Sequence, residues 1–386
     1  MKMVDVAEFY AEAGGGVRTY IDQKLRAAAE AGHESVVVAP GPKNDEQERN
    51  GGRIIWVRSR PLPVDRRYYL LLDEPAVHRI LDRESPQVVE GSSPWTGGWF
   101  AARWPGGALK ALVFHQDPVA VYPHTLLGAF LSPARIDRLF DWYWGYLRQL
   151  SARFDLTVAG GAWLADRLAR FGIHRPTAVP FGIDKRAFSP ALRSEQHRVE
   201  LLRRCGVDGS GKLLVAVSRH HPEKRLGTLL DAFAVASRRR ALGLTIYGDG
   251  PLRRWVQYRA AGIPGVNVAG FITERRTIAR ALASADALLH GSAAETYGLS
   301  VAEAICSGLP LVAPDRGGAA DLAASGYAEL YPPGDASACA NAILRLLDRD
   351  RDAMRAECRL GAESRVLSID EHFRLLFERY AAEGRC

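Results

Sequence analysis

The sequence predicts an α/β protein with two doubly wound domains, each a parallel sheet covered by helices. Short apolar runs alternate with longer helical patterns along the chain, and this alternation indicates parallel strands joined by helices. The pattern is interrupted by a polar, irregular stretch and then restarts. The length of 386 residues exceeds one typical domain and suits two of medium size.

The first half opens on a βαβ unit. Residues 4–9 are predicted as a strand, residues 14–16 as a glycine loop, and residues 17–31 as a helix, before a second strand at 35–39. Further strands of the same sheet are expected at 88–90, 111–115, 156–159 and 178–180.

The second half repeats this organisation. Strands are expected at 213–218, 244–247, 266–269, 287–290 and 311–313, with a helix over 225–237 and a turn at 248–251. We therefore predict an N-terminal domain over residues 1–185, a linker over 186–210 and a C-terminal domain over 211–365. Residues 366–386 are expected to form a helix that packs back on the N-terminal domain.

Composition excludes several classes of protein. Apolar residues make up 47% and charged residues 25% of the chain, as in soluble globular proteins. No apolar stretch is long enough to cross a membrane, and the N-terminus has no apolar segment typical of a secretory signal. Five scattered cysteines fit a reducing compartment. We therefore expect a cytoplasmic protein.

The net charge of +7 favours anionic partners such as nucleotides, phosphates or an acidic membrane surface. Basic residues are spread through both halves without a dense tract, so we expect no nucleic-acid partner.

The most specific motif is the segment Glu295-Thr-Tyr-Gly-Leu-Ser-Val-Ala-Glu303, which follows a predicted buried strand. Gly298 lets the backbone approach a ligand, and Leu299 and Ser300 begin a helix whose free N–H groups can bind a phosphate. Two carboxylates with a helix N-terminus between them suit a nucleotide sugar. The alternative, a capping glutamate and a surface glutamate, is disfavoured by the strand–loop–helix context.

This segment resembles the E-x7-E motif of retaining glycosyltransferases of glycosyltransferase family 4 (glycosyl transferases group 1). Further segments that match the family are residues 217–225, 246–251, 268–271 and 314–318. The resemblance implies the GT-B fold, in which two Rossmann-like domains face each other across a cleft. It also implies that residues 1–185 carry the acceptor side and residues 211–365 the nucleotide-sugar side.

Arg219 and Lys224 lie between a predicted strand and a predicted helix. Two cations at this place can neutralise a diphosphate and stabilise a leaving group, and the resemblance places both on the donor diphosphate. The alternative is a basic flank with solvated side chains. The resemblance further implies that Glu295 holds sugar hydroxyls, that Glu303 binds the ribose, and that Gly248, Gly250 and the backbone near Phe271 approach the base.

In the first domain the candidates are weaker. The loop of Gly14, Gly15 and Gly16 lies near the donor phosphate in the family, although a glycine triplet is also common in tight turns. Its pattern disfavours a nicotinamide site. His115 ends an apolar strand and matches a family histidine near the reacting centre, with a structural histidine as the alternative. Asp117 and Trp95 are candidate acceptor contacts.

No cluster has the spacing of metal ligands. Asp348, Asp350 and Asp352 alternate like a metal-binding D-x-D, but their arginine-rich surroundings indicate a solvated face. The family resemblance also implies transfer without a bound metal.

Two segments suggest a membrane surface. A helix predicted over residues 136–150 is crowded with aromatic side chains, with core spacing that includes Leu139 and Tyr143 and with Trp142 on another face. The arginine-rich stretch of residues 49–67 is the second segment. Either could instead grip an anionic acceptor, and the helix could be packed between two partners.

The sequence therefore predicts a retaining, metal-independent hexosyltransferase. It would move a sugar from a nucleoside-diphosphate sugar to a lipid-linked or glycan acceptor, in glycolipid or polysaccharide synthesis at the inner face of a membrane. The competing interpretation is a soluble small-molecule acceptor. No cofactor is expected, because the nucleotide sugar is a co-substrate, and a UDP-sugar is favoured slightly over a GDP-sugar. The alternatives are a sugar-nucleotide epimerase, a sugar phosphorylase, or a catalytically silent GT-B partner subunit.

Overall fold

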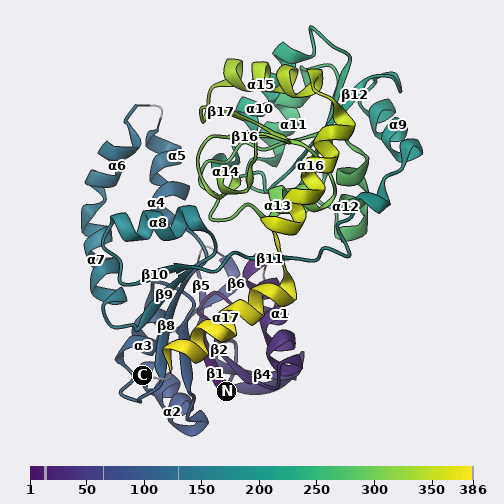
Figure 1. Ribbon diagram of the computed structural model, residues 1–386. Helices are drawn as coiled ribbons and strands as arrows, with labels where there is room; N and C mark the ends of the chain where they lie inside the picture. Colours follow the sequence, from purple (N-terminus) through teal and green to yellow (C-terminus); the bar gives the residue numbers. More distant parts are fainter. Residues whose placement is uncertain (13–14, 64, 129, 385–386) are drawn as a thin grey trace. The chain divides into compact units, whose positions relative to one another are not determined.

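The structure, a computed structural model, describes residues 1–12, 15–63, 65–128 and 130–384 (Figure 1). Gly14 of the predicted glycine loop and Cys386 lie outside these residues. The chain divides into two compact units. Unit 1 comprises Met1–Asp117, Asp137–Pro180 and Ile369–Cys386, and unit 2 comprises Pro118–Ile136 and Phe181–Ser368.

Unit 1 is built on a sheet in which every strand pair is parallel except the last, β3 against β4. In spatial order the strands are β10 (Pro176–Ala178), β9 (Leu156–Ala159), β8 (Leu109–Phe114), β7 (Val88–Gly91), β1 (Lys2–Val6), β2 (Glu34–Gly41), β4 (Gly52–Arg58) and β3 (Asp45–Arg49). A separate antiparallel pair consists of β5 (Arg60–Leu62) and β6 (Asp65–Leu70).

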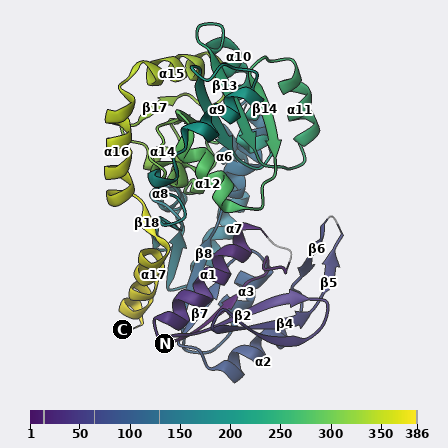
Figure 2. The same ribbon diagram turned by 90° about the vertical axis from the view of Figure 1, so that its right-hand side faces the viewer.

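Helices cover this sheet through apolar stripes. They are α1 (Gly16–Glu30), α2 (Glu74–Glu84), α3 (Thr96–Arg103), α7 (Asp141–Ser151), α8 (Ala162–Arg170) and α17 (Ile369–Glu383), while α6 (Pro133–Leu139) spans the unit boundary. In α1 the buried side chains Ile21, Leu25 and Ala28 recur at helical spacing. The C-terminal α17 lies beside α1 (Figure 1 and Figure 2) and buries Phe373 and Phe377 in the core of unit 1.

Unit 2 contains a fully parallel sheet. Its strands, in spatial order, are β14 (Val266–Gly270), β13 (Leu242–Tyr247), β12 (Lys212–Val217), β15 (Ala287–Leu289), β16 (Leu311–Pro314) and β17 (Ala328–Tyr331). Side chains of β12 alternate between two cores: Leu213 and Val215 belong to one, Leu214 and Ala216 to the other. The sheet is therefore covered on both faces, as a doubly wound fold requires.

The helices of unit 2 include those that connect these strands, and others that precede or follow the sheet in the chain. They are α4 (Pro118–Val121), α5 (Pro123–Leu127), α9 (Glu195–Arg204), α10 (Leu226–Ala236), α11 (Arg253–Ala261), α12 (Arg275–Ser284), α13 (Leu299–Cys306), α14 (Gly318–Leu322), α15 (Ala336–Asp348) and α16 (Arg351–Ser364), with the 3-10 turns η1 (Pro190–Leu192) and η2 (Pro222–Lys224). A short parallel pair joins β11 (Gly182–Ile183) to β18 (Leu367–Ser368).

The stretch predicted as a linker, residues 186–210, is folded into unit 2. It contains η1 and α9, whose Leu201 and Leu202 are buried in the core. Arg198 of the same helix is buried too, and its guanidinium donates to Asp286 at 2.9 Å. The helix-like piece of this stretch is mostly charged and carries little apolar signal, which explains why the sequence predicts a linker and not a packed helix.

The helix predicted over residues 136–150 is two helices, α6 and α7, separated at Phe140. The break shifts the helical phase, so Leu139 is exposed while Trp144 becomes one of the fully buried side chains. The predicted core position at Leu139 was therefore wrong, whereas the one at Tyr143 is buried.

Two other predictions differ in detail. The strand predicted at residues 4–9 is β1 and ends at Val6, because the chain then turns and Tyr10 N donates to Ala7 O at 3.0 Å. The hairpin β3–β4 was not predicted, although Asn50 and Gly51, both at positive φ, are the turn signal that could have found it.

Candidate active site

Parallel strands bring the candidate donor-site residues of unit 2 to one edge of its sheet. Arg219 follows β12, Gly248 follows β13, Phe271 follows β14 and Glu295 lies in the loop after β15. The carboxyl ends of parallel strands share an edge, and ligands of doubly wound sheets bind there.

The centre of this edge is an ion pair between Lys224 and Glu295. Lys224 Nζ lies 2.6 Å from Glu295 Oε1 and 3.3 Å from a carboxylate oxygen of Glu223. The two loops meet closely because residue 291 is glycine: a Cβ at that position would stand 2.5 Å from Lys224 O. The predicted cation and the first predicted carboxylate are therefore brought together, with side-chain exposures of 15% and 20%.

Both groups of this pair are ionised at neutral pH. Burial disfavours the charged lysine, but the charges of Glu295 and Glu223 outweigh it and raise the pKa of Lys224. Burial likewise opposes ionisation of Glu295, yet the charge of Lys224 and its hydrogen bond lower the pKa of Glu295. The pair therefore supplies a fixed cation and a fixed anion at the strand ends.

His290 is a further residue of this centre that sequence reasoning did not assign. It follows β15, is 3% exposed on its side chain, and its Nε2 lies 3.6 Å from Glu295 Oε1. Burial lowers the pKa of His290 to about 4, against the pull of Glu295. The imidazole is therefore neutral at physiological pH, and its Nε2 makes no hydrogen bond to any described residue. The sequence signal that could have identified His290 is its position at the end of an apolar strand.

Glu303 lies on α13, whose N-cap Gly298 has φ +94°. Helix geometry leaves the first amides of α13, at Leu299 and Ser300, without intrahelical acceptors. Arg275 Nη2 donates to Glu303 Oε1 at 2.7 Å. Burial raises the pKa of Glu303 to about 7, with Arg275 opposing the shift. Arg275 is a second residue that the sequence did not flag.

Arg219 is exposed, and no acidic side chain among the described residues pairs with its guanidinium. It differs in this from Lys224, which pairs with Glu295 and Glu223. An exposed, uncompensated cation at the strand ends is suited to a mobile anionic ligand.

Gly248 and Gly250 have a structural role that sequence reasoning did not foresee. Gly248 has φ +129°, and a Cβ there would stand 1.8 Å from Ser218 O. At Gly250, a Cβ would stand 2.7 Å from His220 O. Both glycines therefore permit the loops after β12 and β13 to touch, and base binding by these residues stays a prediction. Phe271 is 67% exposed at the same edge.

In unit 1, His115 follows β8 and lies against Tyr20, with ring centroids 5.2 Å apart. Burial lowers the pKa of His115 to about 4, with a smaller opposing effect from Asp5. Tyr20 in turn contacts His372 of α17, whose Nε2 lies 3.1 Å from the Tyr20 hydroxyl. His115 is thus a neutral imidazole held by aromatic packing.

A buried charge cluster lies beneath this histidine. Lys24 Nζ donates to Asp5 at 2.5 Å and also to Glu90. Ser92 donates to the other oxygen of Asp5. Burial raises the pKa of Glu90, although the charge of Lys24 opposes the shift. Glu90 is therefore part of the interior of unit 1 and not of an open pocket.

The two acceptor candidates differ in placement. Asp117 is buried and paired with Arg167, which also binds Asp137 at 2.7 Å, so this carboxylate has a structural partner. Trp95 is half-exposed and packs on Tyr143 and Tyr146, with centroids 5.9 and 6.2 Å away. An acceptor contact stays a prediction for both, and the aromatic platform at Trp95 is the more accessible.

Gly15 and Gly16 begin α1, and a Cβ at either position would meet nothing within 4 Å. The internal packing of unit 1 therefore does not require glycine at these positions. Open space beside both leaves room for a ligand.

Within the described ranges, no group of three or more His, Cys, Asp or Glu side chains is arranged to hold a metal ion. Of the three alternating aspartates, Asp348 pairs with Arg240 and Asp350 caps α16 through Ala353 N at 2.7 Å. The parts of the chain that the structure describes contain no helix long and apolar enough to cross a membrane.

Comparison with known proteins identifies the family. Residues 14–187 match the family described as Glycosyltransferase Family 4, and residues 211–349 match Glycosyl transferases group 1. The chain is 31% identical over 326 residues to a GDP-mannose-dependent alpha-mannosyltransferase of Mycobacterium tuberculosis, covering 83% of this chain and 81% of the relative. The chain belongs to glycosyltransferase family 4.

This glycosyltransferase is also 27% identical over 321 residues to a GDP-mannose-dependent alpha-(1-6)-phosphatidylinositol dimannoside mannosyltransferase of M. tuberculosis, covering 81% of this chain and 79% of the relative. Among solved structures it is similar to the sucrose-phosphate synthase of Thermosynechococcus elongatus, with a TM-score of 0.76 at 19% identity over 99% of this chain and 98% of that one. The predicted family, the GT-B fold with two Rossmann-like domains, and glycosyl transfer are confirmed.

Proposed function

We propose that this glycosyltransferase is a retaining, metal-independent hexosyltransferase that uses GDP-mannose and a lipid-linked or glycan acceptor. The observation that carries the proposal is the Lys224–Glu295 pair. It lies at the carboxyl ends of the parallel strands of unit 2, and Glu295 belongs to the loop that leads into α13. The names of the two mycobacterial relatives support GDP-mannose. For this reason we place it ahead of the UDP-sugar that the sequence alone favoured.

The geometry of Lys224 suits a diphosphate. An ammonium group has three N–H donors, and carboxylates lie within reach of two of them, at 2.6 and 3.3 Å. The third remains for a phosphate oxygen, and exposed Arg219 supplies a second cation. As the bond from the sugar C1 to the diphosphate oxygen breaks, negative charge grows on that oxygen, and preorganised cations stabilise it.

The same pair suits the sugar. Oε1 of Glu295 faces Lys224 and His290, which leaves Oε2 to accept hydrogen bonds from sugar hydroxyls. Glu303 and the free amides of α13 would take the ribose and a phosphate. In the retaining step the acceptor oxygen bonds C1 on the face that the diphosphate leaves, and the departing phosphate oxygen takes the acceptor proton.

Metal independence is proposed because Arg219 and Lys224 can provide the positive charge that a metal ion provides in other transferases. Transfer should persist in excess EDTA. Complete loss of transfer, restored by Mg²⁺ or Mn²⁺, would overturn this part of the proposal.

The acceptor side is proposed to involve the exposed Trp95, which packs on Tyr143 and Tyr146. Aromatic rings with polar tips suit an amphipathic glycolipid, and one relative is named for a phosphatidylinositol dimannoside acceptor. A peripheral association with an anionic membrane is part of this proposal. The arginine-rich stretch supports it less than its composition suggests, because Arg49, Arg53 and Arg67 are paired with acidic neighbours.

The deciding experiment is transfer from radiolabelled GDP-mannose, UDP-glucose and ADP-glucose to membrane lipid extracts, followed by NMR of the product's anomeric centre. We expect incorporation from GDP-mannose with an α linkage. Incorporation from UDP-glucose alone would change the donor, and a β linkage would exclude retention. Product formation without any acceptor would favour an epimerase or a phosphorylase, and donor binding without turnover would favour a silent partner subunit.

A further inference from the structure

A second region of unit 2 gathers positive charge away from the candidate donor site. It is a pocket of about 360 Å³, and its lining includes four arginines. The lining residues are Pro190, Arg193, Ser307, Gly308, Arg351, Asp352, Arg355 and Arg359. They come from η1, from the C-terminal end of α13 and from α16.

The pocket lies at the opposite edge of the sheet from the candidate donor site. Gly308 stands shortly before β16, and Arg355 Nη2 donates at 2.9 Å to Ala285 O, which stands shortly before β15. These are the amino ends of two parallel strands, whereas Arg219, Glu295 and Gly298 follow carboxyl ends. The arginine pocket is therefore not part of the donor site.

Nearby carboxylates do not neutralise the four arginines. Asp352 lies 3.4 Å from Arg351 but its side chain is 83% exposed, and Glu195 approaches Arg193 only to 3.5 Å. The buried Asp286 binds Arg198 at 2.9 Å through Oδ2, while its Oδ1 bonds no described group, so this one carboxylate is shared among Arg198, Arg193 and Arg355. The pocket consequently keeps an excess of positive charge.

Two guanidinium nitrogens of the pocket also lack hydrogen-bond partners. Arg193 Nη1 and Arg355 Nε are buried, and neither bonds to any described residue. Burial, and then the charges of Arg193 and Arg351, lower the pKa of Arg355 to about 10. Burial and Arg351 also lower the pKa of Arg193. A bound anion would satisfy the free N–H groups and relieve the repulsion.

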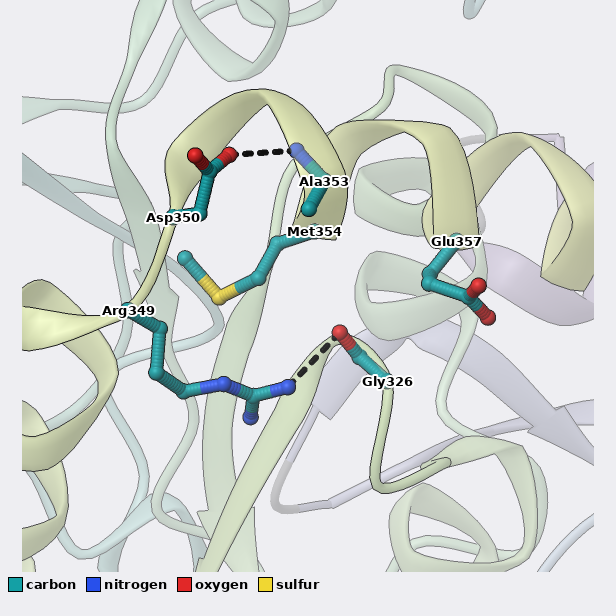
Figure 3. A pocket seen from close by; sticks show the side chains of 6 residues that line it. All are labelled: Gly326, Arg349, Asp350, Ala353, Met354 and Glu357. Carbon is teal, nitrogen blue, oxygen red and sulfur yellow. Dashed lines mark hydrogen bonds between the residues drawn. The ribbon is translucent and has the colours of Figure 1, made fainter.

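A second pocket beside α16 does not share this excess of unpaired arginines. That pocket, of about 440 Å³, is lined by Gly326, Arg349, Asp350, Ala353, Met354 and Glu357 (Figure 3). Its single arginine, Arg349, donates to Gly326 O at 2.8 Å and to Ser325 O at 2.6 Å, so its guanidinium is already used. Two carboxylates complete that lining, and an anion is disfavoured there.

We propose that the pocket of Arg193, Arg351, Arg355 and Arg359 binds a phosphate group at a site separate from the nucleotide sugar. Arg351, Arg355 and Arg359 recur every four residues and therefore share one face of α16. Like charges at this spacing destabilise a helix. An anion bound between the three arginines would offset their repulsion. The planar guanidinium matches phosphate oxygens with paired hydrogen bonds. The ligand is either inorganic phosphate or the phosphate of a lipid headgroup.

The test uses the full chain and the double variant Arg351→Gln/Arg359→Gln, since both side chains are exposed and not needed for the core. Calorimetric titration with inorganic phosphate should show a loss of affinity of roughly tenfold or more, because hydrogen bonds to charged groups are strong. The matched control Arg238→Gln/Arg239→Gln removes the same charge from another exposed segment and should bind as wild type.

Lys224→Ala separates this site from the donor site, since it should retain the phosphate affinity of the pocket. Flotation with phosphatidylcholine vesicles, with and without phosphatidic acid, distinguishes the two sources of phosphate. If the source is a lipid, binding that depends on phosphatidic acid falls in the arginine double variant. If the source is free phosphate, only the calorimetric signal falls.

The proposal is overturned if the arginine double variant keeps wild-type affinity for phosphate and for phosphatidic-acid vesicles, or if wild type binds neither. The unfolding midpoint in phosphate-free buffer checks the fold. It should be unchanged or higher in the double variant, because two charges that each repel Arg355 are gone.

Discussion

At the scale of single residues, Glu295 connects the groups of the candidate donor site. Its Oε1 lies 2.6 Å from Lys224 Nζ and 3.6 Å from His290 Nε2. Removing one partner of this pair affects the contacts with both the sugar and the diphosphate of the proposed donor. Substitution of either residue should therefore strongly reduce the rate of transfer.

Glu295→Gln and Lys224→Ala are each expected to lower kcat by a factor that corresponds to about 3 kcal/mol, as for other preorganised charges in a transition state. The measurement is steady-state transfer, with circular dichroism to verify the fold. Asp348→Asn, which removes an exposed carboxylate bound to Arg240, is the control and should leave transfer unchanged. Rates within a few-fold of wild type for both site variants would contradict the assignment.

Glu303 offers a prediction on pH. Burial raises its pKa to about 7, so the carboxylate is lost as the pH falls through that value. If the carboxylate accepts the ribose hydroxyls, affinity for the donor should rise with pH across neutrality. Lys224, with a raised pKa, and His290, with a pKa near 4, keep their charge states in this window.

The measurement is the Kd of GDP between mildly acidic and mildly basic pH, compared with Glu303→Gln. The variant cannot ionise at this position, so its profile shows the titration of the ligand alone. Identical profiles for the two proteins would exclude a ribose contact through the carboxylate.

At the scale of elements, the loops after the parallel strands decide where the site residues lie. Glycines serve two different purposes in them. Gly248 is required by the contact of its own loop with Ser218, whereas Gly16 starts α1 beside open space. Packing thus distinguishes a structural glycine from one that leaves room for a ligand.

Gly248→Ala should destabilise the protein by about 2 kcal/mol or more, because φ is +129° and a Cβ would overlap Ser218 O. Gly16→Ala should change the free energy of unfolding by less than about 1 kcal/mol, and in the stabilising direction, since alanine favours helices. Urea unfolding measures both. A loss of transfer in Gly16→Ala without loss of stability would support a functional role for the glycine, and stability losses of equal size would contradict the distinction.

At the scale of the whole molecule, the proposed membrane association depends on exposed side chains and not on a spanning helix. Trp142 at the start of α7 is 70% exposed. Lysine and arginine near an anionic surface contribute about 1 kcal/mol each, which allows reversible docking. The net charge of +7 is consistent with such docking.

Wild type is expected to float with anionic vesicles at low salt and less at physiological salt, because ions screen the attraction. Trp142→Ala should reduce flotation, while Tyr258→Ala, which removes a 79% exposed aromatic side chain from α11, is the control. Absence of binding at either salt concentration would remove the membrane proposal and leave the glycosyltransferase family unaffected.

Much of the architecture could be predicted because periodicity is local. Strands with continuous apolar runs, such as β12 and β15, and helices with a single apolar stripe, such as α1, carry their burial pattern in neighbouring residues. The burial of α9 and the break between α6 and α7 were not predicted. The first depends on an ion pair between Arg198 and Asp286, which are distant in sequence, and the second on a shift of helical phase.

The sequence by itself determined the family, the doubly wound fold and the position of the Glu295–Glu303 motif, because these depend on residue order and spacing. Only the tertiary structure decided which charges meet. Lys224 is 71 residues before Glu295 and Arg275 is 28 before Glu303, yet each pair is in hydrogen-bond contact. The arginine pocket is a further example, because its side chains come from segments about 160 residues apart in the chain and only the fold brings their charges together.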